Sequence, residues 1–170
     1  MRDIWVSTGS SPTVFRYIDW LITVPLQIVE FYLILAAVTI VSVRVFWKLL
    51  IASLVMLIGG YLGEVGYVDA TIGFILGMAG WLYIIFEIFK GEASKVNASS
   101  GNLASQTAFK TIRLIVTFGW AIYPIGYFLA YLGGGTNDSE TLNIVYNLAD
   151  LVNKAAFGLA IWVAAISDSE

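Results

Sequence analysis

Long apolar runs separated by short polar stretches form the pattern of this chain. Each run reaches about 20 residues, the length with which an α-helix crosses the hydrocarbon core of a bilayer. The pattern therefore predicts an all-α fold, a polytopic transmembrane helical bundle that forms a single domain. The predicted spans cover about residues 12–39, 46–66, 71–89, 103–132 and 141–166.

Polar and glycine-rich stretches mark where these helices end. Ser11 is a candidate N-cap, and Pro12 suits the first helical position. We expect the polar stretch from Gly91 to Gly101 to be a loop, and the glycines at 133–135 to end the fourth span. Every connection is short, which predicts one bundle rather than two domains.

Composition narrows the class of protein. Hydrophobic residues make up 59% of the 170 residues and charged ones 12%, with a mean hydropathy of +0.83. Such a chain is typical of an integral membrane protein, whose partner is the lipid bilayer. The net charge is −3 without a basic tract, so no nucleic-acid partner is expected. Cysteine and histidine are absent, which excludes disulfides and histidine metal sites; we expect neither a metal site nor an enzyme.

Charged residues in the connections predict the orientation. Basic side chains gather between spans one and two and around the connection of spans three and four: Arg44, Lys48, Lys90, Lys95, Lys110 and Arg113. The opposite side carries Arg2 with Asp3, Asp69, Asp138 and Glu140. The positive-inside rule therefore puts the N-terminus outside and the C-terminus in the cytoplasm.

Lys154 is a charged residue inside the last apolar run. A charge at the centre of a membrane helix costs roughly 2.5–3.5 kcal/mol, so it usually has a partner or a function. Asp150 precedes it by four residues and shares its helix face. A buried amine beside a carboxylate suggests a covalent attachment point.

A line of polar side chains follows the first span. Arg16, Asp19 and Thr23 are spaced by three and four residues and share a face. Glu30 comes later on the same stripe, about 20° round the helix from Asp19 and about 16 Å along it. This separation suits the two ends of a proton path better than a carboxylate dyad or a shared metal site. The alternative is that these charges pair structurally with other helices.

Several aromatic residues lie within the spans, whereas interfacial belts prefer the ends. They either pack the interior or together wall a flat apolar ligand. Glu64 and Glu87 fall near span ends, and we expect both carboxylates to be solvated. The aromatic set comprises Trp20, Trp81, Trp120, Tyr123 and Tyr146.

Three segments carry a family likeness. They are residues 16–26 (RYIDWLITVPL), 119–124 (GWAIYP) and 147–154 (NLADLVNK). In this order they resemble the microbial rhodopsins, and most of all the blue-absorbing proteorhodopsins. The resemblance extends from about Met1 to Ile166 and implies the seven-helix rhodopsin fold, of which this chain would supply helices three to seven.

The resemblance implies a role for each position. Lys154 would form the Schiff base with all-trans retinal, Asp19 would be the main counterion and proton acceptor, and Asp150 the second counterion. Arg16 would shape the outward side of this cluster, and Glu30 would be the cytoplasmic proton donor. The retinal pocket would include Trp20, Thr23, Gln27, Met56, Trp81, Trp120, Tyr123, Pro124 and Tyr146.

The function that follows is a retinal-binding, light-driven outward proton pump in the bacterial plasma membrane. Asp19, Thr23 and Glu30 are similar to the acceptor–threonine–donor pattern of the pumps. Glu30 argues against the nearest alternative, a sensory photoreceptor on the same scaffold. A retinal-free membrane transporter or structural subunit is the alternative from another class.

Further positions refine the resemblance. Glutamine at position 27 is the mark of the blue-absorbing group, because a polar dipole near the Schiff base stabilises the localised ground-state charge. Phe74 stands where pumps with a carotenoid antenna have glycine, so no antenna is expected. The first two family helices would be missing, along with a histidine that hydrogen-bonds the acceptor aspartate. We expect a homo-oligomer in the full-length form.

Overall fold

The computed structural model describes residues 13–133 and 139–169. Within these residues every regular element is a helix, and five stretches are long and apolar enough to cross a bilayer. The expected all-α bundle with five membrane-length spans is therefore confirmed. The expected N-cap Ser11, Pro12 and the second and third glycines of 133–135 lie outside the described residues.

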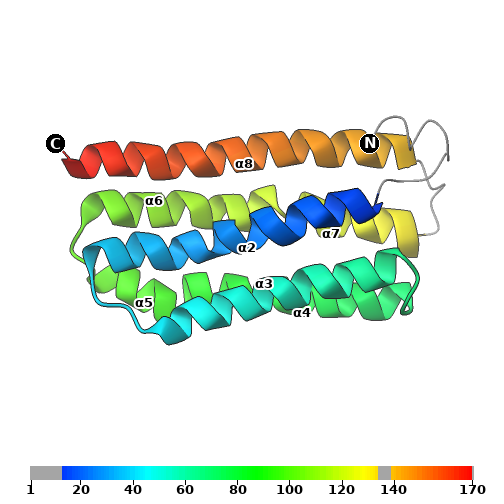
Figure 1. Ribbon diagram of the computed structural model, residues 1–170, viewed down its shortest axis with the longest axis horizontal. Helices are drawn as coiled ribbons and strands as arrows, with labels where there is room; N and C mark the ends of the chain where they lie inside the picture. Colours follow the sequence, from blue (N-terminus) through cyan, green and yellow to red (C-terminus); the bar gives the residue numbers. More distant parts are fainter. Residues whose placement is uncertain (1–12, 134–138, 170) are drawn as a thin grey trace.

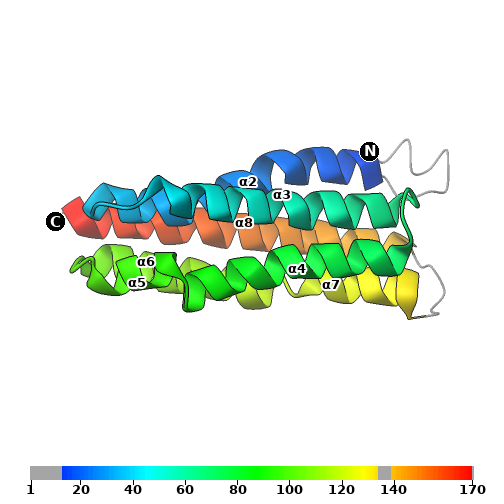
Figure 2. The same ribbon diagram turned by 90° about the horizontal axis from the view of Figure 1, so that it is seen from below.

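The first three spans are α2 (Thr13–Val38), α3 (Val43–Glu64) and α4 (Ala70–Phe89). Helices α3 and α4 lie side by side in both views (Figures 1 and 2). Glycines let their backbones approach closely, since a Cβ on Gly73 would lie only 2.5 Å from Gly63 Cα. Small residues at such a contact are typical of helix packing in membranes, where close van der Waals contact drives association.

We expected a loop between the third and fourth spans, but this prediction was wrong. The stretch contains the helix α5 (Glu92–Ser99). The carboxylate of Glu87, at the end of α4, accepts hydrogen bonds from the backbone N–H groups of Glu92 at 2.8 Å and Ala93 at 3.2 Å. It thus satisfies donors that a helix start leaves without partners. The polar composition did not reveal this cap, because Glu87 comes from the preceding helix.

The fourth span is irregular. It runs through α6 (Leu103–Leu114), the π-helical turn η1 (Ile115–Gly119), α7 (Ile122–Tyr127) and a second π-helical turn, η2 (Phe128–Leu132). Pro124 lies inside this region and has no N–H to donate, which disturbs the regular hydrogen-bond ladder. In η1 the Trp120 N–H reaches back five residues to the Ile115 carbonyl, at 3.1 Å.

The last span, α8 (Ser139–Ser169), lies beside α6 at one side of the bundle (Figure 1). Its C-terminal end lies at the opposite end of the bundle from the start of α2. Toward that C-terminal end, the interior is filled by apolar side chains, with the Phe31 and Phe109 rings edge to face at 5.0 Å. These rings and Ile28, Leu35 and Ile112 are fully buried.

Candidate functional site

Lys154 lies between two carboxylates. Its Nζ is 2.5 Å from Asp19 Oδ2 and 3.8 Å from Asp150 Oδ2. Asp150 is one turn earlier on α8, as the i,i+4 spacing indicated, whereas Asp19 comes from α2. The ammonium group is therefore neutralised from two helices, which is what a cation in a membrane span requires.

The two carboxylates differ in their surroundings. Asp150 accepts a hydrogen bond from Trp20 Nε1 at 2.9 Å on one oxygen and from the Tyr123 hydroxyl at 2.6 Å on the other. The side chain of Asp19 is 42% exposed, against 18% for Asp150. Asp150 thus has two neutral hydrogen-bond donors, whereas Asp19 makes the shorter contact with the lysine.

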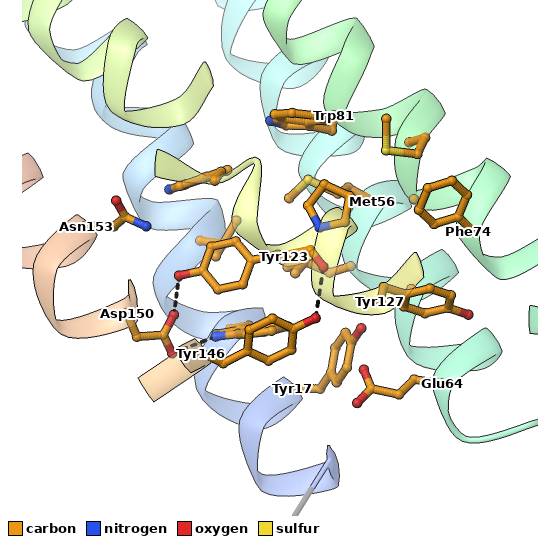
Figure 3. A pocket seen from close by; sticks show the side chains of 18 of the residues that line it. Tyr17, Met56, Glu64, Phe74, Trp81, Tyr123, Tyr127, Tyr146, Asp150 and Asn153 are labelled. Carbon is orange, nitrogen blue, oxygen red and sulfur yellow. Dashed lines mark hydrogen bonds between the residues drawn. The ribbon is translucent and has the colours of Figure 1, made fainter. Parts of the chain in front are cut away.

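A mostly apolar cavity opens beside Lys154, and aromatic side chains from four spans form its wall (Figure 3). The indole of Trp81 is fixed by a hydrogen bond of 3.0 Å to the Val116 carbonyl, and the Tyr146 hydroxyl donates to the Tyr123 carbonyl at 2.9 Å. Trp20 packs edge to face on Tyr123 at 5.1 Å. The expected residues that line the cavity are Trp20, Gln27, Met56, Trp81, Trp120, Tyr123, Pro124, Tyr146, Asp150 and Lys154.

Four expected residues on α2 lie outside this lining: Arg16 and Asp19, which pair with other charged side chains, and Thr23 and Glu30. The Thr23 hydroxyl donates to the Asp19 carbonyl at 3.0 Å, which is the ordinary back-bond of a helical threonine. Glu30 is partly buried, about three turns along α2 from Asp19. Neither the Thr23 nor the Glu30 side chain lines the cavity that Lys154 faces. Any function of these two residues therefore concerns the proton path along α2 rather than ligand contact.

A second polar cluster lies toward the start of α2. Arg16 Nη1 is 2.9 Å from Glu64 Oε1, and both side chains are buried. The same carboxylate oxygen accepts hydrogen bonds from Thr13 at 3.1 Å and from the Tyr131 hydroxyl at 3.0 Å. The guanidinium carbon also lies 4.9 Å from the centre of the Tyr146 ring, so this cluster adjoins the cavity wall.

Comparison with known proteins decides the family. The sequence matches the family described as "Bacteriorhodopsin-like protein" over residues 2–168. The chain belongs to this family. It is 54% identical over 169 residues to the green-light absorbing proteorhodopsin of Gamma-proteobacterium EBAC31A08, a match that covers 99% of this chain and 68% of the relative. A blue-light absorbing proteorhodopsin of Gamma-proteobacterium Hot 75m4 is also 54% identical, with 99% and 67% covered.

Solved structures agree with this assignment. The crystal structure of a blue light-absorbing proteorhodopsin from Med12 superposes with a TM-score of 0.80 at 62% identity, and covers 99% of this chain and 74% of that one. Exiguobacterium sibiricum rhodopsin gives a TM-score of 0.81 at 34% identity, with 94% and 68% covered. Sensory rhodopsin III of Haloarcula marismortui is more distant, at 30% identity over 156 residues. The likeness to the proteorhodopsins expected from the sequence is therefore confirmed.

Sequence reasoning missed several polar residues of this bacteriorhodopsin-like chain. Glu64 and Glu87 were expected to be solvated, but their side chains are only 2% exposed. Their position at the ends of apolar runs was misleading, because partners from other helices bury them. Asn153 was also missed: it lines the cavity, is 8% exposed and donates to the Gly119 carbonyl at 3.0 Å. Its place directly before Lys154 was the available signal.

Proposed function

We propose that this protein is a retinal-binding, light-driven outward proton pump of the bacterial plasma membrane. The observation that carries the proposal is the amine of Lys154, paired with Asp19 and Asp150 at the edge of an aromatic cavity. The relatives named as proteorhodopsins share at least half of their aligned residues with this chain. The light-absorbing function in those names fits a site that combines a reactive amine, two carboxylates and an aromatic cavity.

The residues present suit a flat polyene. An elongated apolar ligand needs aromatic walls and one reactive polar end, and the cavity combines these walls with the Lys154 amine. Its proposed lining includes Trp20, Gln27, Met56, Trp81, Trp120, Tyr123, Pro124 and Tyr146. All-trans retinal, held covalently at Lys154, would supply light absorption and a light-driven change of shape.

The protein's own groups would move the proton. Asp19 lies closest to the Lys154 amine, at 2.5 Å, so we assign it as the acceptor. Asp150 accepts hydrogen bonds from Trp20 and Tyr123 and lies 3.8 Å from the amine, so we assign it as the second counterion. Arg16 closes the outward side of the pair.

Glu30 would reload the amine from the cytoplasmic side. It follows Asp19 on α2 by about 16 Å, so the proposed donor is well separated along the span from the acceptor at Lys154. Thr23 lies between them on the same helix. The presence of a carboxylate at Glu30 favours the pump over a sensory photoreceptor. The N-terminus of the chain would lie outside and its C-terminus in the cytoplasm.

Two residues of the cavity wall bear on light absorption: Gln27 on the wavelength absorbed, and Phe74 on whether a carotenoid antenna can reach the ligand. The Gln27 side chain lines the same cavity as Lys154, and we infer that its dipole favours blue absorption. Phe74 packs against Tyr127 and Phe128, with ring centres 5.7 and 6.1 Å apart, and fills the wall between α4 and the fourth span. We infer that it leaves no window for a carotenoid antenna. A homo-oligomer remains our expectation for the assembled protein.

The test is light-driven acidification. Bacterial cells that produce the protein are supplied with all-trans retinal, and the pH of the unbuffered suspension is recorded in the dark and under blue light. We expect acidification in light that a protonophore abolishes, and a visible absorption band that Lys154→Ala removes. A band without any light-driven pH change would refute the pump and favour a photosensor, whereas the absence of a band would refute retinal binding.

A further inference from the structure

The irregular fourth span leaves a carbonyl without its usual helical donor. In a continuous α-helix the Gly119 carbonyl would accept from the N–H four residues later, that of Tyr123. Here the Tyr123 N–H donates to the Trp120 carbonyl instead, at 3.1 Å. The π-helical turn η1 ends at Gly119 and the next helix begins at Ile122, so the ladder changes register at this point.

Asn153 supplies the donor from another span. Its Nδ2 lies 3.0 Å from the Gly119 carbonyl oxygen, and its side chain is buried. Buried carbonyl groups are nearly always paired, and this pairing crosses from α8 to the fourth span. Figure 3 shows Asn153 on the same side of α8 as Asp150, turned toward the aromatic wall.

The absence of a side chain at Gly119 leaves room for the Asn153 amide. A Cβ at position 119 would overlap Asn153 Oδ1 and lie 3.0 Å from its Cγ. Two observations describe the same contact: the hydrogen bond to the carbonyl, and the space that a glycine leaves for the amide. Together they define a latch, the contact between Asn153 and Gly119.

The latch joins two groups that face the cavity. Lys154 follows Asn153 on α8, and Trp120 follows Gly119 on the fourth span; both line the cavity. We propose that Asn153 is a positioning residue, which fastens the irregular turn of the fourth span to α8 and so fixes Trp120 against the ligand at Lys154. This inference rests on the proposed function for the identity of the ligand, whereas the latch itself is a property of the protein.

The experiment separates the latch from retinal binding. Asn153→Leu keeps much of the side-chain volume but removes the donor, and Gly119→Ala keeps the donor but fills its space. Gly158→Ala is the matched control, because a Cβ at Gly158 on α8 would meet no atom within 4 Å. The two latch variants are also combined, and each protein is measured without retinal and after reconstitution with all-trans retinal.

Without retinal, hydrogen–deuterium exchange of the peptide that spans residues 119–123 is measured. We expect exchange about two- to tenfold faster in Asn153→Leu, the range that one lost buried hydrogen bond gives. Gly119→Ala should match it, the double variant should add nothing further, and Gly158→Ala should equal the parent. Unchanged exchange in Asn153→Leu, or fully additive effects in the double variant, would overturn the latch.

With retinal, the absorption maximum is compared. We expect Asn153→Leu and Gly119→Ala to shift it in the same direction, because both release Trp120 from its place, and Gly158→Ala to leave it unmoved. A maximum identical to the parent in both latch variants would overturn the positioning role. If the parent itself forms no visible band, the proposed function fails, and the exchange measurement still decides whether the latch exists.

Discussion

Arg16 and Glu64 form a buried ion pair between the first and second spans, with 2.9 Å between Nη1 and Oε1. The pair is close to the cavity, since the Arg16 guanidinium also faces the Tyr146 ring. Removing one member of a buried pair leaves the other charge in surroundings of low polarity, which costs more than the pair contributes. The pair therefore holds the start of α2 and the end of α3 in one arrangement.

We expect Glu64→Gln to destabilise the protein by about 3–5 kcal/mol, because the negative charge opposite Arg16 is lost. The measurement is the thermal unfolding midpoint of the purified protein in detergent. Glu92→Gln is the matched control: this carboxylate pairs with Lys48 at 3.0 Å but is 34% exposed, and exposed pairs contribute about 0–1 kcal/mol. Equal midpoints for the two variants would contradict the buried role of Glu64.

Asp19→Asn should abolish light-driven acidification while the visible band remains. An amide at this position accepts no proton from the Lys154 amine, whereas Asp150 still balances its charge from 3.8 Å. Acidification by retinal-supplied cells is the measurement. Asp168→Asn provides the control, because Asp168 bonds Asn102 near the end of α8, and it should pump like the parent. Pumping by Asp19→Asn would assign the acceptor elsewhere.

Local spacing explains what the sequence could predict. Apolar runs of membrane length specify helices whatever their neighbours are, so the all-α bundle followed from the pattern alone. The i,i+4 spacing likewise predicted that Asp150 shares a helix face with Lys154, and the two side chains do lie 3.8 Å apart. Both inferences depend only on one helix and its period.

Contacts between distant segments explain what the sequence could not predict. The burial of Glu64 depends on Arg16, 48 residues away, and on Tyr131, 67 residues away. The start of α5 is capped by Glu87, and the Gly119 carbonyl beside the change of register accepts from Asn153. Periodicity within one run carries no signal for such partners, because they are set by how the spans pack.

Gln27→Leu should move the absorption maximum to longer wavelength. The Gln27 side chain lines the cavity, and its dipole stabilises the charge localised near Lys154 more than a delocalised excited-state charge. Spectra of the retinal-bound proteins are compared. Gln106→Leu, outside the lining residues on α6, is the control and should leave the maximum in place. An unmoved maximum in Gln27→Leu would exclude this tuning role.

Glu87→Ala should destabilise the start of α5 and so speed amide exchange in that helix. The Glu87 side chain is 2% exposed, and its carboxylate accepts hydrogen bonds from two backbone N–H groups at the start of that helix. Hydrogen bonds to a charged group contribute about 1.5–3 kcal/mol each, so their loss should expose the amides of α5 to exchange. Hydrogen–deuterium exchange of residues 92–99 is the measurement. Glu87→Gln keeps one acceptor oxygen and should fall between the parent and Glu87→Ala; identical exchange in all three proteins would rule out the cap.

Asp69 caps the start of α4, and this cap should depend on pH. Its carboxylate accepts from the Thr71 N–H at 2.8 Å, and the hydrogen bonds from Thr71 lower the pKa of Asp69 below its ordinary value of 3.8. Because the folded pKa is the lower one, the stabilisation is complete above 3.8 and is lost as pH falls through the folded pKa.

Asp69→Asn removes this titration but keeps an oxygen that can cap the helix. The unfolding midpoints of parent and variant are compared between about pH 6 and pH 2. We expect the parent to lose its advantage over Asp69→Asn only below about pH 4, where the free carboxyl group begins to protonate. Other carboxylates titrate in the same range, but they are common to both proteins and largely cancel in the difference. A difference between the two midpoints that stays constant over the whole range would show that the charge of Asp69 does not stabilise the start of α4.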